Sequence, residues 1–576
     1  MYSNRLTPEQ RRTALAEMTT GDPLDILVVG GGITGAGIAL DAVTRGLRTG
    51  VVEAQDWAGG TSAWSSKLVH GGLRYLYNLD FPLVAEALRE RGLLMTTTAP
   101  HLVKAQPFLW PLKMPVIERS YSAIGVGMYD ALALAGARGE RTVPRQKHYS
   151  RKGALRLFPD IREDALVGAI RFYDARVDDA RLVLDVVRTA VGYGALAASR
   201  TQVVDYLKDD DGRVVGAVIA DLETGAYHPV HAKEVINATG VWTEETERLG
   251  GDGGLKVLAS KGIHIVVPRE RINGEAGIFL RTEKSVLFII PWERYWVIGT
   301  TDTEWTEQKS HPVATSEDID YVLDHANSVL AANLTRADII GTYAGLRPLL
   351  QPGTKSGSEK GSTKISREHT ITRVAPGLSA IAGGKLTTYR VMAEDAIDFV
   401  LGEEAAEANP SVTEEVPLVG AAGYRALVSQ TATIAERYGW DETRVTRLLD
   451  RYGDEVPTLL AMIDAEPDLG QPLGAADAYL RAEVAFAATH EGALHLEDVL
   501  RRRVRLDYEM RDRGLAALPE IGAIVADHLG WSESRRTSEE QAYTAQAEAV
   551  HAAEAQATDA EASREVLRAP DLVPMR

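Results

Sequence analysis

The feature that most constrains the fold is a glycine-rich turn near the start of the chain, formed by Gly30, Gly32 and Gly35. The apolar run before it, residues 24–29, predicts a buried parallel strand, and residues 33–45 predict the helix that follows. Glycines at these positions permit a tight turn, close approach of the backbone to a phosphate, and close packing of the helix on the strand. The pattern therefore predicts a dinucleotide-binding β-α-β unit.

An acidic residue completes this pattern. Glu53 ends a second short apolar run and follows Gly30 by 23 residues. At this position a carboxylate can accept hydrogen bonds from a ribose 2′-hydroxyl, and its charge disfavours a 2′-phosphate. The N-terminus of the intervening helix presents free N–H groups to a pyrophosphate. The expected ligand is therefore an ADP-containing dinucleotide, either FAD or NAD.

The composition of the chain excludes several other kinds of site. Its 576 residues exceed what one hydrophobic core can hold, so several domains are expected. It has no cysteine, which excludes disulfides, thiolate metal sites, a cysteine nucleophile and a cysteinyl link to a flavin. A formal net charge of −18 argues against a nucleic-acid partner. The histidines are dispersed, so we expect no metal site.

The distribution of apolar residues indicates where the protein is located. The first residues lack the apolar core of a signal peptide, and no run of about 18 uncharged apolar residues is present to span a bilayer. We therefore expect a cytoplasmic protein. The largely apolar segment 105–135 could touch a membrane surface, although packing in a core or a dimer contact explains it more simply.

The next elements favour a flavin over a nicotinamide. Residues 203–206, 214–220 and 227–231 predict short alternating strands, and residues 235–240 predict a return strand that ends in a small-residue turn. A β-meander followed by such a strand is typical of flavin-binding nucleotide folds.

The rest of the chain divides into a strand-rich part and a helical part. Residues 263–267, 286–291 and 296–300 predict strands of a mixed sheet that covers the cofactor. Residues 378–385 return to a glycine-rich turn, and a helix follows to about residue 401. From about residue 424 the apolar spacing is helical.

Several blocks of sequence resemble FAD-dependent glycerol-3-phosphate dehydrogenases. The longest block, residues 61–76, reads Thr-Ser-Ala-Trp-Ser-Ser-Lys-Leu-Val-His-Gly-Gly-Leu-Arg-Tyr-Leu, and residues 383–390 read Gly-Gly-Lys-Leu-Thr-Thr-Tyr-Arg. Further blocks in the family's order are residues 176–182, 260–268, 298–302 and 345–349. The resemblance covers the chain from about residue 22 to 400, and it continues more loosely to about residue 530.

This resemblance implies an α/β fold in which a Rossmann-like FAD-binding domain is combined with a mixed β-sheet substrate cap and an all-helical C-terminal domain. The implied FAD-binding domain comprises residues 22–110, 176–254 and 370–402, and the implied cap comprises residues 111–175 and 255–369. The remaining implied units are an N-terminal extension (1–21), the helical domain (403–545) and a partly disordered Ala/Glu-rich tail (546–576).

The resemblance also implies an activity: oxidation of sn-glycerol 3-phosphate to dihydroxyacetone phosphate by hydride transfer to non-covalently bound FAD. Electrons would pass to a membrane quinone (ubiquinone or menaquinone), and a homodimer with peripheral membrane contact is expected. An oxidase that reduces oxygen to hydrogen peroxide is the main alternative. An NAD-dependent dehydrogenase and a flavin-binding scaffold without activity are further alternatives, which the lone nucleotide fingerprint and the separate cationic blocks disfavour.

Three residues are the expected catalytic groups. Alcohol oxidation needs an electron acceptor, a base for the hydroxyl proton, and positive charge near the developing alkoxide. His264, on a predicted strand, is the candidate base because the ordinary pKa of histidine suits proton transfer near neutrality. Arg347 is expected to stabilise the oxyanion, and Lys385 to hold the substrate and stabilise the anion of the reduced flavin. A structural histidine and a surface ion pair of Arg347 stay open as alternatives.

The remaining expected site residues follow from the resemblance. Those expected to bind substrate are His70, Arg74, Tyr75, Arg367 and Thr388, with Arg74 and Arg367 as phosphate anchors. Those expected to bind the cofactor are Gly30, Gly32, Ile33, Thr34, Gly35, Glu53, Ala54, Thr61, Ser62, Ser66, Lys67, His70, Ala238, Gly240, Gly384, Lys385, Leu386 and Thr387.

Overall fold

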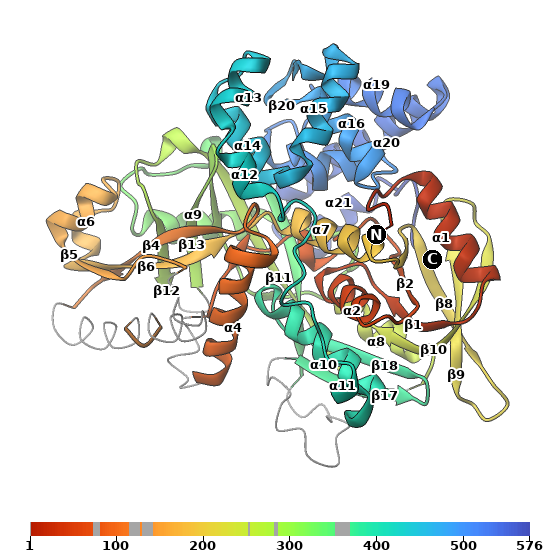
Figure 1. Cartoon of the computed structure of the whole chain (residues 1–576). Helices are drawn as coiled ribbons and strands as arrows, with labels where there is room; N and C mark the ends of the chain where they lie inside the picture. The colour runs from red at the N-terminus through yellow and green to blue at the C-terminus, as the bar shows by residue number, and fades with distance from the viewer. Residues whose placement is uncertain are drawn as a thin grey trace.

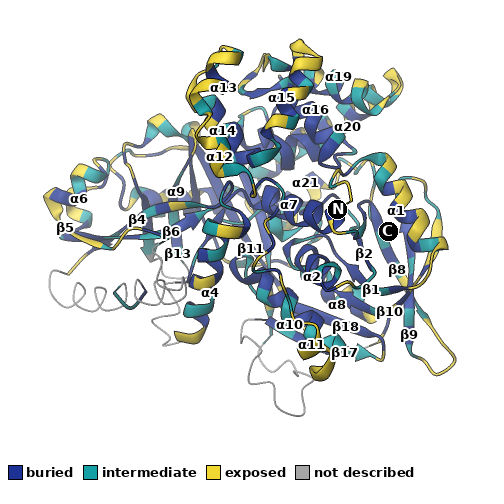
Figure 2. Cartoon of the chain, in the orientation of Figure 1, coloured by how far each residue is buried: buried dark blue, intermediate teal, exposed yellow. Residues whose placement is uncertain are grey.

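The computed structural model of the chain describes residues 2–72, 81–114, 127–129, 142–251, 254–281, 286–351 and 369–576. Two β-sheets lie next to each other, and a group of helices lies above them in the orientation of Figure 1. Most strands are buried, whereas the outer surfaces of the peripheral helices are exposed (Figure 2). This arrangement agrees with the α/β fold and the helical C-terminal domain that the sequence predicts.

The first sheet contains the predicted dinucleotide-binding unit. Its central order is β17–β18–β10–β1–β2–β7, and β18, β10, β1, β2 and β7 are parallel. The bounds are β1 (Leu24–Val29), β2 (Thr49–Val52), β7 (Leu196–Ala198), β8 (Thr201–Lys208), β9 (Val214–Asp221), β10 (Tyr227–Asn237), β17 (His369–Ala375) and β18 (Leu378–Gly383). The two strands predicted at 227–231 and 235–240 are one strand, β10, which pairs first with β9 and then with β1.

Both faces of this sheet are covered. The helices α2 (Ile33–Thr44), α7 (Asp179–Gly192) and α10 (Tyr389–Leu401) pack on the face that carries Ile26 and Val28. On the other face, Leu27 and Val29 pack against α1 (Pro8–Thr20) and the β8–β9 pair. Burial on both faces explains why β1 is a continuous apolar run rather than an alternating one.

The second sheet contains the strands of the ranges predicted for the cap, and it also contains β3 and β4, which lie mostly in the range predicted for the FAD-binding domain. Its order is β15–β11–β14–β13–β12–β4–β6–β3, with β16 beside β11 and β5 beside β6. The bounds are β3 (Leu68–Val69), β4 (Lys104–Leu112), β5 (Lys147–Ser150), β6 (Gly168–Arg176), β11 (Val257–Pro268), β12 (Gly277–Arg281), β13 (Val286–Trp292), β14 (Tyr295–Gly299), β15 (Thr303–Glu304) and β16 (Gly341–Leu350). The helices α6 (Arg151–Leu157) and α9 (Ser316–Asn327) cover one face, and α4 (Phe81–Leu93) packs on the other.

The remaining described elements are mostly helical. Two short helices, α8 (Thr243–Arg248) and α11 (Glu403–Ala408), occur earlier in the chain. The C-terminal region contains α12 (Tyr424–Val428), α13 (Thr431–Tyr438), α14 (Glu442–Tyr452), α15 (Val456–Ala465), α16 (Arg481–His490), α17 (Leu496–Asp498), α18 (Leu506–Glu509) and α19 (Leu518–Leu529). A short hairpin, β19 (Pro472–Leu473) and β20 (Ala476–Leu480), departs from the all-helical expectation.

The tail after residue 545 is packed against the protein, which differs from the expectation of partial disorder. The helices α20 (Glu533–Glu554) and α21 (Asp559–Val566) bury Ala553 and Ala562 against Val313 of the cap region. Asp559 also forms an ion pair with the buried ammonium of Lys261 on β11. The Ala/Glu-rich composition did not predict this packing, because small alanines supply part of the contact.

Buried ion pairs join the helical region to the nucleotide-binding sheet. The guanidinium of Arg503 contacts both carboxylate oxygens of Asp56, at 2.7 and 2.9 Å, and Arg505 lies 3.0 Å from Asp178. All four side chains are buried. Loss of one member of such a pair leaves an uncompensated buried charge, which is strongly destabilising. The pairs therefore hold the helical region against the nucleotide-binding sheet.

The described part of the chain contains no helix long and apolar enough to cross a membrane. The start of the apolar segment 105–135 belongs to β4, which pairs with β6 and β12 inside the cap sheet. The residues described there therefore have a packing role.

A buried histidine makes stability pH-dependent. The ring nitrogens of His495 lie 2.8 Å from Glu223 and 2.8 Å from Glu539. Although burial acts in the opposite direction, these carboxylates raise the pKa of His495 to about 9. The pair interactions stabilise the fold fully below about pH 6.5 and are lost as the pH rises through about 9. These interactions contribute on the order of 3 kcal/mol to the free energy of unfolding.

We expect the thermal midpoint to fall between pH 7 and pH 10 in the wild type. His495→Gln should unfold at a lower temperature at pH 7 and show a flatter profile, and His228→Gln, on the partly exposed start of β10, should behave like the wild type. Calorimetry at closely spaced pH values checks this. Parallel profiles for His495→Gln and wild type would contradict the assignment.

Candidate active site

The predicted glycine-rich turn connects β1 to α2 with backbone contacts that exclude side chains. Gly30 has φ +113°, and a Cβ atom on it would lie 2.6 Å from the carbonyl oxygen of Ala238. A Cβ on Gly35 would lie 1.9 Å from the carbonyl oxygen of Gly30. Both distances are far below van der Waals contact, so only glycine fits at either position. The turn therefore brings the end of β10 and the start of α2 against the end of β1.

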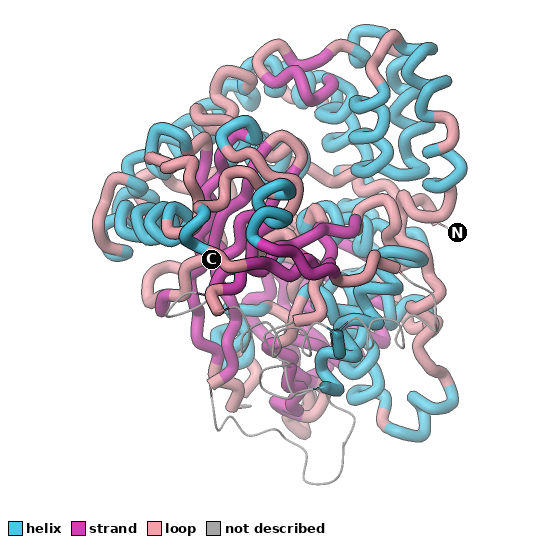
Figure 3. Tube along the Cα trace, turned by 90° about the vertical axis from the view of Figure 1, so that its left-hand side faces the viewer, coloured by secondary structure: helices cyan, strands magenta, loops and turns pink. Residues whose placement is uncertain are grey.

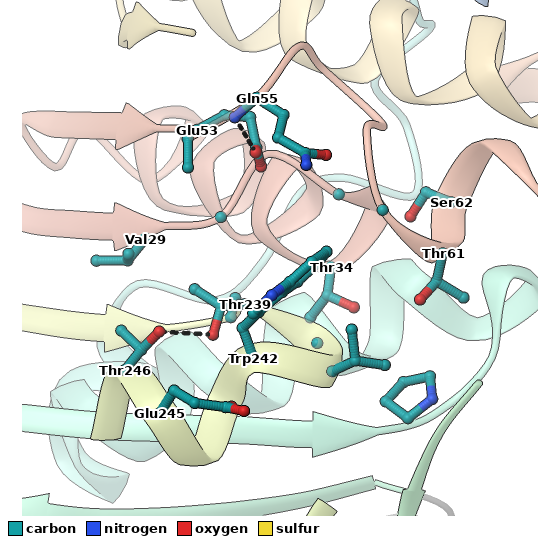
Figure 4. Close-up of a pocket in the computed structure, with 18 of the residues that line it drawn as sticks. Val29, Thr34, Glu53, Gln55, Thr61, Ser62, Thr239, Trp242, Glu245 and Thr246 are labelled. Atoms are coloured by element: carbon teal, nitrogen blue, oxygen red, sulfur yellow. Dashed lines mark hydrogen bonds between the residues drawn. The ribbon is translucent and has the colours of Figure 1, made fainter. Parts of the chain in front are cut away.

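The N-terminus of α2 faces the space next to this turn. Its N-cap, Gly32, has no side chain that could accept the first N–H groups of the helix. The hydroxyl of Ser62 accepts a hydrogen bond from the backbone N–H of Ile33 at 2.9 Å. Figure 4 shows Ser62, Thr61 and Thr34 around this helix end. The N–H groups and the helix dipole favour an anion such as a pyrophosphate.

Glu53 lies directly after β2, next to the same turn. Its carboxylate accepts hydrogen bonds from the backbone N–H of Gly31 at 2.6 Å and from that of Gln55 at 2.7 Å. Figure 4 shows the second of these bonds. Desolvation raises the pKa of Glu53, and these two N–H groups oppose that shift. Each carboxylate oxygen has further lone pairs, so the group can accept a ribose hydroxyl as predicted.

A cavity of about 910 Å³ extends along these groups. This volume lies at the upper end of the range for small-molecule and cofactor sites. The expected cofactor residues that line it are Gly30, Gly32, Ile33, Thr34, Glu53, Ala54, Thr61, Ser62, Ala238, Gly240, Gly384, Lys385 and Leu386. The size, the glycine cradle and the donor set fit a dinucleotide such as FAD.

Other expected residues lie behind the cavity wall or outside the described residues. Gly35, Ser66, Lys67, His70, Thr387, Thr388, His264 and Arg347 do not line the cavity. The backbone N–H of His70 donates to Thr387 at 3.1 Å, next to the lining residue Leu386. Arg74, Tyr75 and Arg367 lie outside the described residues, so their roles stay predictions.

Lys67 has a different environment from the expected cofactor contact. Its ammonium is buried, lies 2.7 Å from the carboxylate of Asp179, and sits over the rings of Tyr343 and Tyr508 at 5.1 and 5.2 Å. The ion pair compensates the buried charge. Lys67 therefore contacts two tyrosine rings, and one of them, Tyr343, stacks on His264.

Sequence reasoning missed one wall of the cavity. The missed lining residues include Gln55, Thr201, Gln202, Val203, Val204, Tyr227, Thr239, Trp242, Glu245, Met575 and Arg576. The position of β8 beside Glu53, where Thr201 N–H donates to the Glu53 carbonyl oxygen at 2.7 Å, could have been inferred from the predicted meander. No local signal identified Met575 and Arg576.

His264 occupies a buried polar position on β11. Its Nε2 lies 2.9 Å from the hydroxyl of Ser66, and its ring stacks on Tyr343 with centres 4.7 Å apart. Nδ1 has no hydrogen-bond partner among the described residues. Burial, and next the charges of Arg347 and Lys67, lower the pKa of His264 well below its ordinary value of 6.5. The imidazole is therefore neutral at neutral pH and can accept a proton.

The guanidinium of Arg347 lies beside this histidine across Gly262. A Cβ on Gly262 would lie 2.5 Å from the Arg347 guanidinium, so the glycine makes room for the charge. Arg347 donates to the hydroxyl of Thr300 at 3.0 Å, and a partly exposed ion pair with Asp302 at 3.1 Å also exists. Arg347 thus forms an ion pair, as the open alternative predicted, and it also lies near His264.

The polar residues around His264 adjoin part of the cavity wall. Ser65 and Pro348 line the cavity and directly adjoin Ser66 and Arg347 in the sequence. The hydroxyl of Thr61 donates to the Leu346 carbonyl oxygen at 2.6 Å, which ties β16 to the cavity wall. Ser66, which contacts His264, and Arg347 are therefore each next in the sequence to a residue of the cavity wall.

Comparison with known families agrees with this geometry. Residues 25–390 match a family described as FAD dependent oxidoreductase, and residues 411–536 match the C-terminal domain of alpha-glycerophosphate oxidase. The first match spans more than half of the chain and includes both the glycine turn and Lys385.

Similar proteins cover nearly the whole chain. Glycerol-3-phosphate dehydrogenase 2 of Mycobacterium tuberculosis is 49% identical over 98% of this chain and 94% of its own length. Glycerol-3-phosphate dehydrogenase of Mycobacterium leprae is 48% identical over 98% and 95%. The crystal structure of glycerol-3-phosphate dehydrogenase from Bacillus halodurans complexed with FAD has a TM-score of 0.76 and 28% identity, and covers 95% of this chain and 98% of its own. The chain therefore belongs to the glycerol-3-phosphate dehydrogenase family of FAD-dependent oxidoreductases.

Proposed function

We propose that this protein oxidises sn-glycerol 3-phosphate to dihydroxyacetone phosphate, with FAD as the hydride acceptor and a membrane quinone as the final electron acceptor. The observation that carries the proposal is the neutral imidazole of His264 beside the guanidinium of Arg347, next to a dinucleotide cavity that Lys385 lines. The names of the similar proteins support the substrate.

The cavity residues hold the cofactor in this proposal. The first turn of α2 would hold the pyrophosphate, Glu53 would hold the ribose of the adenosine half, and Gly384, Lys385 and Leu386, with Thr387 behind them, would hold the flavin end. Bound there, FAD would supply the acceptor for the hydride of the carbinol carbon. The absence of cysteine excludes a cysteinyl link, which is consistent with non-covalent binding.

His264 acts as the base. Alcohol oxidation removes a proton from the hydroxyl group as the hydride leaves the carbon, so a neutral acceptor must be present at working pH. Burial and the two nearby cations keep the imidazole neutral. The hydroxyl proton goes to Nε2, the ring atom that faces Ser66.

The cations bind the anionic parts of the substrate. Arg347 stabilises the developing alkoxide next to His264, and Lys385 neutralises negative charge at the flavin end of the cavity. We assign the phosphate to Arg74 and Arg367, which sequence resemblance favours, with His70, Tyr75 and Thr388 as further substrate contacts. A guanidinium suits this task because its planar fork can bind two phosphate oxygens at once.

The final acceptor distinguishes the two candidate enzymes. The dehydrogenase names of similar proteins favour a quinone, whereas the name of the matched C-terminal family favours oxygen as a second candidate. We also propose a cytoplasmic homodimer with peripheral membrane contact, because a membrane quinone must be reached from a chain whose described helices do not cross the bilayer.

Purified protein supplied with glycerol 3-phosphate tests the proposal. We expect dihydroxyacetone phosphate to form and a soluble quinone analogue to be reduced about tenfold faster than oxygen is converted to peroxide. Comparable peroxide formation would instead identify an oxidase. No product with either acceptor would contradict the proposed reaction.

Gly35→Ala should prevent FAD retention, because its Cβ would overlap the Gly30 carbonyl oxygen. The matched control is Gly192→Ala in α7, where a Cβ would make only an ordinary 3.5 Å contact with Asn4. Flavin absorbance per protein after gel filtration checks this. Full flavin content in Gly35→Ala would show that the turn does not determine binding.

The pH dependence of kcat at saturating substrate should locate the base. Because the pKa of His264 is depressed, activity should fall only below about pH 6.5, as the imidazole becomes protonated. His264→Asn should lower kcat by about 10²–10⁴-fold and remove this acidic limb. Saturation limits interference from the substrate phosphate, whose own second pKa is about 6. An acidic limb above pH 7 would rule out a neutral His264.

Lys385→Ala and Arg347→Ala should each lower turnover by about 10²-fold or more while the protein stays yellow. Arg248→Ala is the control, because this exposed α8 residue forms an ion pair with the nearby Glu244. Steady-state rates and visible spectra are the measurements. Colourless protein from both site variants would assign these residues to cofactor binding instead.

A further inference from the structure

The last residues of the sequence lie across the cofactor cavity. Met575 and Arg576 line the same cavity as Glu53. In Figure 1 this end of the chain lies beside β8 and α1, and Figure 3 shows it in front of the strands. The tail therefore reaches a wall that belongs to the nucleotide-binding sheet.

Arg576 is held at this wall by several contacts. Its backbone N–H donates to Oε1 of Gln202 at 2.7 Å, and Nε2 of Gln202 donates to its carbonyl oxygen at 2.8 Å. Its guanidinium lies 4.8 Å from the ring centre of Tyr227 and also donates to the tyrosine hydroxyl. The two hydrogen bonds between the Gln202 side chain and the Arg576 backbone resemble pairing between strands. The cation–π contact with Tyr227 adds to them.

A second anchor holds the segment upstream. The carboxylate of Asp571 lies 2.9 Å from Nε2 of His311 and accepts a longer hydrogen bond, 3.4 Å, from Gln546. Between the anchors, Leu572 and Val573 lie near Arg200 and His495. Leu572 is 40% exposed, so the segment is a thin cover rather than part of the core. Residues 572–576 are therefore fixed at both ends and can be released without unfolding a core.

The covered end of the cavity is the adenine end. Glu53 marks the ribose position, and its carbonyl oxygen accepts a hydrogen bond from Thr201, the residue before Gln202. Beyond Glu53 the lining residues are Gln55, Val203 and Tyr227 together with the tail. An adenine ring requires apolar and aromatic faces, and a thioether and a cation stacked on tyrosine supply suitable ones.

We propose that residues 572–576 form a strap that closes the adenine end of the FAD site and slows FAD release. Closure removes the adenine from water and requires the Gln202 and Tyr227 contacts to break before the cofactor leaves. The strap contains no group assigned to the oxidation step, so it determines cofactor retention rather than turnover.

FAD dissociation from the full-length holoenzyme tests the strap. The fluorescence increase of released FAD after dilution gives the rate for wild type, a chain ending at Asp571, Arg576→Ala and Arg568→Ala. The shortened chain should release FAD about tenfold faster. Arg576→Ala should do so about threefold faster, because the Gln202 contacts with the backbone remain. Arg568→Ala, a largely exposed arginine of the same tail that pairs with Glu565, should match the wild type.

Two further measurements separate this role from a structural one. The thermal midpoint of the apoprotein should differ little between wild type and Arg576→Ala, and FAD should slow hydrogen exchange at the amide of Arg576 about tenfold. Unchanged FAD release in both tail variants would overturn the proposal. A lowered thermal midpoint of the apoprotein together with an unchanged rate of FAD release would also overturn the proposal. If the shortened chain fails to fold, Arg576→Ala and the exchange measurement decide.

Discussion

The contact on which the structure most depends is the close approach of Gly35 to the carbonyl oxygen of Gly30. It allows α2 to begin directly at the end of β1, with its N-terminus facing the cavity. Because β1, β2 and β10 are parallel, the same edge of the sheet also receives Glu53 and Ala238. A helix dipole, an acidic hydrogen-bond acceptor and a close backbone turn are thereby combined in one dinucleotide site.

The proposed chemistry depends on a second arrangement, in which the cations Arg347 and Lys67 lie near the neutral His264. Packing, rather than direct bonding, connects the helical region to this arrangement, since Tyr508 lies against Tyr343 and Tyr343 stacks on His264. Lys67 lies over both tyrosines and is compensated by Asp179. Burial of the imidazole, and next the positive charges of Arg347 and Lys67, lower the pKa of His264.

The sequence predicted the elements whose signals are local. The β1 strand, the α2 helix and the position of Glu53 follow from apolar periodicity and glycine spacing, and the structure confirms them. Contacts set by tertiary packing were not predicted. The union of the two predicted strands in β10 and the adenine wall depend on pairing with distant strands, and the tail carries no glycine, turn or charge pattern that indicates its place beside Gln202. Family resemblance, rather than physics, supplied Arg74 and Arg367.

We propose that an electron-accepting cofactor lies next to a neutral base and to cations that bind a phosphorylated alcohol. Anaerobic titration of the flavin-loaded protein with glycerol 3-phosphate tests this most directly, followed at the oxidised flavin band near ~450 nm. The account predicts loss of the band with about one dihydroxyacetone phosphate formed per flavin, and no loss with glycerol, which lacks the phosphate. A band that persists at saturating glycerol 3-phosphate would contradict it.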